Sequence, residues 1–347
     1  MGKSLFIYGY PGSVGGADTK LDHTLPIFTK LGFDQVMCIA NAPSQFEDEH
    51  WKKYMDSLGV KYGLKEEIKN DKKGDIALSM CNPYFFSDGF CDHAKSKEFE
   101  VIWSSEMMWH HTKELEYVNK GFVDKILYVS DIQKSKLTYP DNIPSYYIGN
   151  YIDSTRFPFR ERDTSKFRLG RLSRADSYKY PENFPSFYER IVENIPINDV
   201  EFHVMGWYKK DDRNLIDKYS WHDFTKYNWY LYEENAIPSL DFLYNIDIYA
   251  YPLGHNFIES WGRSTVESML TGCIPIFFSG HHLQNLIVDR DVGYIADDVK
   301  DWTGIIDLLY NNTTLRKSQS KACSDYAREV ICNEEEHIKI WKEVFNV

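Results

Sequence analysis

The sequence has no C-x-x-C pair and no apolar run of the roughly 18 residues that a bilayer-spanning helix requires. Its six cysteines are scattered, and several lie in apolar runs where a free thiol behaves as a small hydrophobic side chain. The opening segment "SLFIYGY" is strand-like and too short for a signal peptide. We therefore expect a cytoplasmic, reduced protein without a transmembrane segment.

Basic residues are outnumbered by acidic ones: the sequence has 40 Lys and Arg and 52 Asp and Glu, which gives a net charge of −12. This balance argues against broad, nonspecific nucleic-acid binding. One Lys-rich segment, residues 50–73, departs from it with seven lysines and four acids. It is either a solvated face or a patch that meets anionic lipid or a phosphate-bearing acceptor, in which case the protein is membrane-peripheral.

The length of 347 residues fits two domains, and 43% apolar with 27% charged residues excludes a disordered or fibrous chain. Apolar strand-like runs alternate with glycine loops and helical runs, as in parallel α/β sheets. The pattern begins at residues 4–9 and restarts at 167–173, after a polar, proline-broken connection at 150–166. Further strands are expected at 33–41, 100–105, 124–130 and 145–149 in the first half, and at 200–206, 247–253 and 273–279 in the second. We predict domains at 1–150 and 151–330, and a C-terminal helix at 331–347 that packs back on the first domain.

Two loops that follow predicted strands carry ligand-binding chemistry. "GSVGGAD" (12–18) places Gly15 and Gly16 at a strand-to-helix turn, where a backbone can approach an anion. Its spacing fits neither the P-loop nor G-x-G-x-x-G, and a plain tight turn is the alternative. "GRLSRADSYKYPENF" (170–184) gathers Arg171, Arg174 and Lys179, either as a diphosphate clamp or as a basic surface loop.

The segment "ESWGRSTVESMLTGCIPIF" (259–277) places Glu259 and Glu267 eight positions apart. A glutamate can accept hydrogen bonds from two hydroxyls at once, as a sugar diol offers. The string Ser264-x-x-Glu267 also matches a capping box at the start of a helix, so Glu267 has a structural alternative. Capping does not account for Glu259.

The stretch "YPLGHNFIESWGRSTVESMLTGCIPIFFS" resembles the nucleotide-sugar motif of retaining GT-B glycosyltransferases of the family 4 type. "GRLSRADSYK", "KILYVSDIQKSKL" and "IPSYYIGNYIDSTRFPF" are similar to other motifs of that family and occur in the same order. The resemblance covers most of residues 120–310. It implies an α/β fold of the GT-B type, with two Rossmann-like, doubly wound domains facing a central cleft, an acceptor-side first domain and a nucleotide-sugar-binding second domain.

The resemblance implies roles for the matching residues. Glu267 would bind the donor ribose, Glu259 the hydroxyls of the transferred sugar, and Arg171 and Lys179 the diphosphate, with Arg174 as a rival. The backbone would complete the cradle at Gly15, Gly16, Gly262, Arg263, Ser264 and Thr265. No metal and no cofactor are required, and "DRD" (289–291) is interpreted as a turn.

One departure from the family concerns "VIWSSEMMWHH", where members often carry a histidine facing the sugar. Glu106 stands near that place and could act as a general base or stabilise an oxocarbenium ion. The alternative is that Glu106 is an acid at a helix N-terminus. His110 and His111 are interpreted as structural.

The sequence thus predicts a retaining hexosyltransferase that uses UDP-glucose or a relative, with a glycan or lipid-linked acceptor. Two alternatives stay open: a phage-type DNA glycosyltransferase acting on a hydroxymethylated base, and a non-catalytic protein that binds sugar nucleotides. A nicotinamide-dependent dehydrogenase fits less well, because "FDQVMCIAN" ends without an acid for the ribose.

Overall fold

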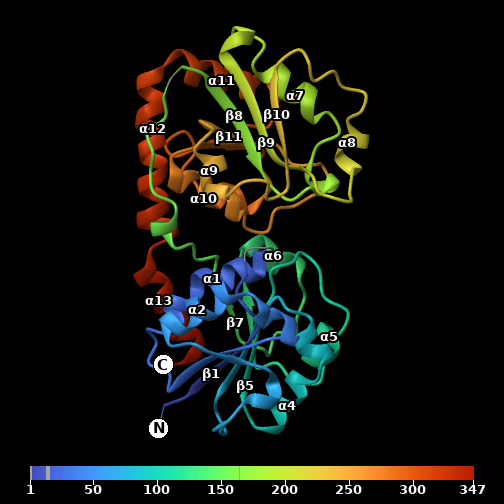
Figure 1. Ribbon diagram of the computed structural model, residues 1–347, viewed down its shortest axis with the longest axis vertical. Helices are drawn as coiled ribbons and strands as arrows, with labels where there is room; N and C mark the ends of the chain where they lie inside the picture. Colours follow the sequence, from blue (N-terminus) through green and yellow to red (C-terminus); the bar gives the residue numbers. More distant parts are fainter. Residues whose placement is uncertain (1, 13–15, 164) are drawn as a thin grey trace. The chain divides into compact units, whose positions relative to one another are not determined.

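The computed structural model describes residues 2–12, 16–163 and 165–347 (Figure 1). The chain divides into two compact units, which are described separately. Unit 1 comprises Met1–Asp153 and Asn333–Val347, and unit 2 comprises Ser154–Cys332. None of the helices in the described ranges combines the length and hydropathy needed to cross a membrane.

The described residues of unit 1 form a seven-stranded parallel sheet in the order β3-β2-β1-β4-β5-β6-β7. Parallel strands need crossover connections, and helices supply most of them. The strands are β1 (Ser4–Tyr8), β2 (Gln35–Ile39), β3 (Lys61–Gly63), β4 (Ile76–Met80), β5 (Glu100–Ser104), β6 (Lys125–Tyr128) and β7 (Ser145–Tyr147). The helices are α1 (Gly16–Phe28), α2 (Glu49–Leu58), α3 (Tyr84–Ser87), α4 (Phe90–Ser96), α5 (Glu114–Asn119), α6 (Asp131–Lys136) and α13 (Glu334–Phe345).

Strand β1 shows why this sheet is covered on both faces. Successive side chains of a strand point to opposite faces. Leu5 and Ile7 belong to a core cluster with residues of α1, α2 and α13, whereas Phe6 and Tyr8 belong to a second cluster with α3, α4 and α5. An uninterrupted apolar strand such as "SLFIY" is therefore buried on both sides, as parallel sheets require.

Helix α13 brings the C-terminus of the chain into unit 1 (Figure 1). Its aromatic side chains pack on α1 edge to face: the ring centroids of Trp341 and Phe28 are 4.8 Å apart, and those of Phe345 and Phe28 are 5.7 Å apart. The core of unit 1 is thus built from two segments that are distant in the sequence.

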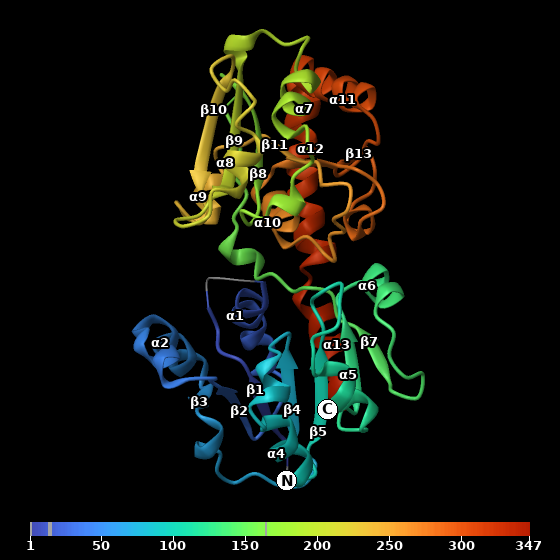
Figure 2. The same ribbon diagram turned by 90° about the vertical axis from the view of Figure 1, so that its right-hand side faces the viewer.

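The described residues of unit 2 form a six-stranded parallel sheet in the order β10-β9-β8-β11-β12-β13. Figure 2 shows α7 and α11 side by side in this unit. The strands are β8 (Phe167–Leu172), β9 (Val200–Tyr208), β10 (Asn228–Glu233), β11 (Ile248–Tyr251), β12 (Ile274–Phe277) and β13 (Tyr294–Ile295). The helices are α7 (Phe184–Ile191), α8 (Asn214–Lys218), α9 (Ser239–Leu243), α10 (Arg263–Thr271), α11 (Val299–Asn311) and α12 (Thr313–Tyr326).

The prediction of two parallel-sheet α/β domains is confirmed. The sequence analysis placed β1, β2, β5, β6 and β7 in the first domain and β8, β9, β11 and β12 in the second. It missed the central strand β4 and the edge strands β3, β10 and β13, and it did not predict helices α2, α3, α4, α6, α8 and α12.

Candidate functional site

The order of the strands in unit 2 reverses between β8 and β11, which are hydrogen-bonded neighbours although β9 and β10 lie between them in the sequence. Ligands of doubly wound sheets bind outside the carboxyl ends of the strands at such a switch point. The loop after β8 carries Lys179, and the loop after β11 carries Glu259. Topology therefore brings two of the predicted residues to one place.

Arg171, near the end of β8, forms hydrogen bonds to the backbone of both loops. Its side chain is 0% exposed. Nη2 donates a hydrogen bond to the carbonyl oxygen of Lys179 at 2.8 Å, and Nη1 donates to that of Pro252. The guanidinium lies 3.8 Å from the ring centroid of Tyr180 and 4.6 Å from that of Tyr251. Arg171 thus holds the backbone of both loops and does not reach the surface.

Lys179, Glu259 and Tyr251 form a compact polar cluster above Arg171. Lys179 Nζ lies 3.1 Å from Glu259 Oε2, and the Tyr251 hydroxyl donates to the same oxygen at 3.0 Å. The Lys179 and Glu259 side chains are 11% and 12% exposed, so the ion pair is largely shielded from water. Burial acts to raise the pKa of Glu259, but Lys179 and Tyr251 outweigh it and hold that pKa below its ordinary value. Glu259 is therefore a carboxylate at neutral pH.

His281 lies in the loop after β12, at the same edge of the sheet, and contacts the backbone of Glu259. Its Nδ1 accepts a hydrogen bond from the backbone N–H of Glu259 at 3.3 Å. Burial lowers the pKa of His281, although the charge of Glu259 opposes that shift. The ring is therefore neutral at pH 7, as its acceptor role requires.

The N-terminus of α10 differs from the predicted capping box. The N-cap is Gly262, with φ of 87°, and no side chain caps the helix. A Cβ at Gly262 would lie 2.2 Å from Cδ2 of Leu283, so glycine suits both the left-handed backbone and the close packing. The capping-box prediction for Ser264 and Glu267 is wrong, because the helix begins at Arg263.

Ser264 and Glu267 have other partners. The Ser264 hydroxyl is 2.7 Å from that of Tyr249, which also donates to the carbonyl oxygen of Leu172 at 2.7 Å. Glu267 Oε1 lies 3.5 Å from Arg263 Nη2. Burial raises the pKa of Glu267, and Arg263 opposes the shift. Thr265 is buried, and within the described ranges its hydroxyl has no hydrogen-bond partner.

Of the other predicted site residues, Arg174 belongs to unit 2 and Gly16 to unit 1. Arg174 is exposed, and its guanidinium forms no ion pair with the residues that the structure describes. Gly16 begins α1 in unit 1, and Gly15 lies outside the described residues.

Glu106 belongs to unit 1, after β5. Its Oε1 lies 2.6 Å from Lys20 Nζ of α1 and 3.1 Å from the Ser104 hydroxyl. The alternative of a helix N-terminal acid is wrong, since α5 begins at Glu114. His110 Nδ1 lies 3.2 Å from Glu114 Oε1, a contact that fits the structural interpretation of this histidine.

No group of three or more His, Cys, Asp or Glu side chains within the described ranges could hold a metal ion. "DRD" (289–291) lies in a turn before β13, as predicted, and Asp289 Oδ1 accepts the N–H of Ile295 at 2.9 Å.

Three residues at this site were not predicted. Tyr251 belongs to the cluster, His281 contacts Glu259, and Tyr249 contacts Ser264. The tyrosines alternate along β11 with one residue between them, so they point to one face. Tyr251 could have been predicted, because it is the last residue of a strand and the loop after that strand carries an acid. His281 could have been predicted from its position in the loop after the next strand, β12.

No protein-family model and no curated protein matches the chain. Solved structures do match it. Anabaena HepE in complex with UDP-glucose has 13% sequence identity, covers 100% of both chains and superposes with a TM-score of 0.72. Sucrose-phosphate synthase from Thermosynechococcus elongatus has 11% identity, covers 99% of this chain and 98% of its own, and has a TM-score of 0.70.

S. aureus TarM, solved in complex with UDP, has 18% identity over 82% of this chain and 57% of its own, with a TM-score of 0.65. At such identities the likeness establishes the fold. The predicted fold class, two Rossmann-like α/β domains of the GT-B type, is confirmed.

Proposed function

We propose that this chain is a glycosyltransferase that moves a hexose from a nucleotide sugar, UDP-glucose or a relative, to an acceptor hydroxyl with retention of configuration. The observation that carries the proposal is the Lys179–Glu259 ion pair at the switch point of the unit 2 sheet. The neighbours add support, because HepE was solved with UDP-glucose and TarM with UDP.

In this proposal the diphosphate of the donor replaces Glu259 as the ionic partner of Lys179. Lys179 is largely shielded and is neutralised by Glu259, so its charge is compensated before the donor binds. An incoming diphosphate takes Lys179 Nζ as its counter-charge. Glu259 then keeps the Tyr251 hydrogen bond and offers its remaining lone pairs to the sugar hydroxyls.

The N-terminus of α10 supplies further contacts. The first N–H groups of a helix have no partner within the helix and carry partial positive charge, which favours an anion. Those of Arg263 and Ser264 are proposed to face the diphosphate, and Gly262 lets the donor approach the backbone. The N–H of Thr265 already donates to the carbonyl oxygen of Gly262 at 3.1 Å, so Thr265 is proposed to contribute instead its hydroxyl, which has no partner among the described residues. Glu267, one helical turn further along, is proposed to accept the two ribose hydroxyls.

For Arg171 we propose a positioning role. Its guanidinium is fully buried and donates to two loop carbonyls, so it fixes where the backbones of Lys179 and Pro252 stand. The diphosphate contact is then assigned to Lys179. Arg174 is the second candidate for this contact, because it is the exposed cation nearest to Lys179 in the sequence.

The reaction breaks the bond between the anomeric carbon and the diphosphate oxygen and forms a bond from that carbon to the acceptor oxygen. The acceptor proton passes to the departing phosphate. Lys179 and the α10 N–H groups stabilise the negative charge that develops on the leaving group, a contribution that commonly dominates catalysis. Glu106 stays a prediction, and Glu106→Gln should retain UDP binding while losing transfer.

The acceptor is proposed to be a glycan or a lipid-linked sugar. The Lys-rich segment 50–73 offers less free charge than its sequence suggests, which weighs against the DNA alternative. Four of its lysines pair with carboxylates, and Lys61 Nζ bonds to the Gln35 side chain at 2.9 Å. The ion pairs are Lys52–Glu49, Lys65–Asp88, Lys72–Asp34 and Lys73–Glu98.

A two-stage assay tests the proposal. UDP should raise the melting midpoint of the full chain while NAD leaves it unchanged. A panel of labelled UDP- and GDP-sugars should then show hydrolysis of one donor by the wild type and none by Lys179→Ala. Stabilisation by UDP with no hydrolysis or transfer of any donor would favour the non-catalytic alternative. Stabilisation by NAD alone would reject both.

A further inference from the structure

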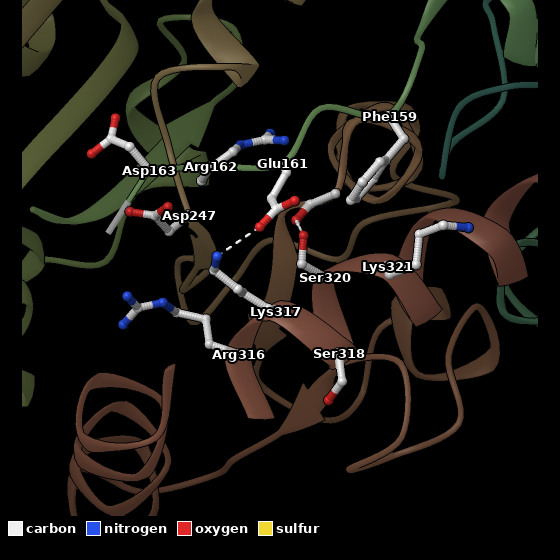
Figure 3. A pocket seen from close by; sticks show the side chains of 11 residues that line it. Phe159, Glu161, Arg162, Asp163, Asp247, Arg316, Lys317, Ser318, Ser320 and Lys321 are labelled. Carbon is white, nitrogen blue, oxygen red and sulfur yellow. Dashed lines mark hydrogen bonds and ion pairs between the residues drawn. The ribbon is translucent and has the colours of Figure 1, made fainter. Parts of the chain in front are cut away.

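A cavity of about 420 Å³ lies in unit 2 at the amino ends of the strands, the opposite edge of the sheet from Lys179 and Glu259 (Figure 3). Asp247 directly precedes β11, and Gly272 ends α10 just before β12. The remaining walls are the segment 159–163 and residues 316–321 of α12. This volume falls within the roughly 300–1,000 Å³ of small-molecule sites.

Arg162 makes one wall of the cavity rigid. Its Nη2 donates to the carbonyl oxygen of Leu243 at 2.9 Å, and its Nε donates to that of Ile246 at 3.1 Å. Nη1 donates to the carbonyl oxygen of Thr271, at the end of α10. Because these carbonyls belong to helix ends and a loop, the guanidinium fixes the segment 159–163 against the sheet edge.

Arg316 places a positive charge beside the cavity. It is 7% exposed, its Nη1 donates to the carbonyl oxygen of Leu309 at 3.0 Å, and its guanidinium lies 5.1 Å from the ring centroid of Phe167. Burial lowers the pKa of Arg316, and the negative charge of Asp247 opposes that shift, although none of the described ion pairs within 4.0 Å involves Arg316. A largely buried guanidinium that is only partly compensated is stabilised further when an anion binds beside it.

Asp247 contributes a hydrogen-bond acceptor to the same cavity. Its Oδ2 accepts the backbone N–H of Arg168 at 2.9 Å, and the described residues give Oδ1 no hydrogen bond. The residue is 4% exposed, and burial raises its pKa to about 6. At pH 7 and above the carboxylate can therefore accept a ligand hydroxyl.

Lys317 and Phe159 complete the lining. Lys317 is half-exposed, and its Nζ lies 2.6 Å from Glu161 Oε1, the dashed contact across the cavity in Figure 3. The ring of Phe159 gives an apolar surface, with Lys321 Nζ 5.7 Å from its centroid. Cations, an aromatic face and the carboxylates of Glu161, Asp163 and Asp247 thus line one space.

We propose that this cavity binds a phosphorylated monosaccharide. The phosphate group meets Arg316 and Lys317, a sugar hydroxyl donates to Asp247, and the C–H face of the sugar ring packs on Phe159. The site is separate from the nucleotide-sugar site and does not depend on it.

The test measures binding of glucose 6-phosphate to the full-length chain by isothermal titration calorimetry at pH 7.5. Inorganic phosphate and glucose are titrated separately as controls, because each contains one part of the probe. The titration is carried out on the wild type in saturating UDP and on Lys179→Ala, so that binding at the switch point does not contribute. We expect saturable binding of glucose 6-phosphate in both, weaker binding of phosphate and none of glucose.

Three variants locate the site. Lys317→Ala should weaken binding about tenfold, the loss expected for one charge-assisted hydrogen bond. Glu161→Gln should tighten it, because it releases Lys317 from its ion pair. The matched control is Lys300→Ala, an exposed lysine on α11 that should bind as the wild type does.

Three results would overturn the proposal. The first is the absence of saturable glucose 6-phosphate binding by a wild-type chain that melts normally. The second is unchanged affinity in Lys317→Ala, and the third is phosphate that binds as tightly as the sugar phosphate. In that last case the cavity recognises no sugar.

Discussion

Nη2 of Arg171 lies 2.8 Å from the carbonyl oxygen of Lys179, so a fully buried cation fixes the backbone of a residue whose own ammonium group pairs with Glu259. The two positive charges therefore have different tasks. Arg171 sets the geometry of the loops, and Lys179 presents charge at the edge of the sheet.

Arg171→Lys should destabilise the protein by about 3 kcal/mol. Lysine has one nitrogen in place of the planar fork, so at least one of the carbonyls of Lys179 and Pro252 is left buried without its donor. Chemical denaturation measures the effect. Arg174→Ala, at an exposed position three residues away, should change stability by less than about 0.5 kcal/mol. Equal stability of Arg171→Lys and the wild type would contradict the positioning role.

Lys179→Ala should weaken UDP binding by about tenfold to a hundredfold, because a charge-assisted hydrogen bond to phosphate contributes about 1.5–3 kcal/mol. Uridine has no phosphate and should bind the variant and the wild type equally. Calorimetric titration of both ligands checks this, with Lys300→Ala as the exposed-lysine control. A parallel loss of uridine affinity would mean that the substitution disturbs the loop rather than the phosphate contact.

Glu259→Gln should bind UDP more tightly than the wild type but transfer sugar more slowly. The substitution removes the carboxylate that competes with the diphosphate for Lys179, and it also weakens the acceptor of the sugar hydroxyls. Titration with UDP and a turnover assay with the donor found in the panel measure the two effects. A loss of UDP affinity would count against the exchange of partners.

Gly262→Ala should cost about 1–3 kcal/mol of stability, because φ of 87° is strained for a residue with a side chain. The added Cβ would also meet Leu283 Cδ2 at 2.2 Å. The double variant with Leu283→Ala removes that clash but leaves the backbone strain and adds a cavity. Thermal unfolding of the single and double variants should therefore show no rescue, whereas full rescue would assign the whole cost to the clash.

Asp247→Asn should stabilise unit 2 at pH 7.5 by up to about 3 kcal/mol. Burial raises the pKa of Asp247 from 3.8 to about 6, a difference of about two units at about 1.4 kcal/mol each. The folded form binds the proton more tightly, so the contribution of Asp247 to stability falls as pH rises from about 4 to about 6. Asparagine can still accept the Arg168 N–H, and it does not titrate.

Denaturation at pH 4, 5, 6 and 7.5 measures this difference. The gap between the variant and the wild type should open between pH 4 and 6 and stay constant above. A constant gap at all four pH values would show that Asp247 does not titrate in this window.

The strands that the sequence predicted are those whose apolar runs stand next to glycine or a charged turn, such as "SLFIYG". Strand β4 was missed although it is central, because "IALSM" has one β-branched residue and no aromatic residue and follows a lysine-rich segment. Strand β10, "NWYLYE", was missed because it lies at a sheet edge, is only partly buried and has polar residues at both ends.

By itself the sequence determined the α/β class, the restart of the pattern at residue 167 and the identity of Lys179 and Glu259 as candidates. These follow from local apolar runs and from the types of residue in the loops. The tertiary structure decided that the two side chains meet, that Arg171 is buried close to them and that Gly262 rather than Ser264 is the N-cap of α10. The reason is the order of the strands: β8 and β11 become neighbours only when the sheet forms, and no local pattern records that pairing.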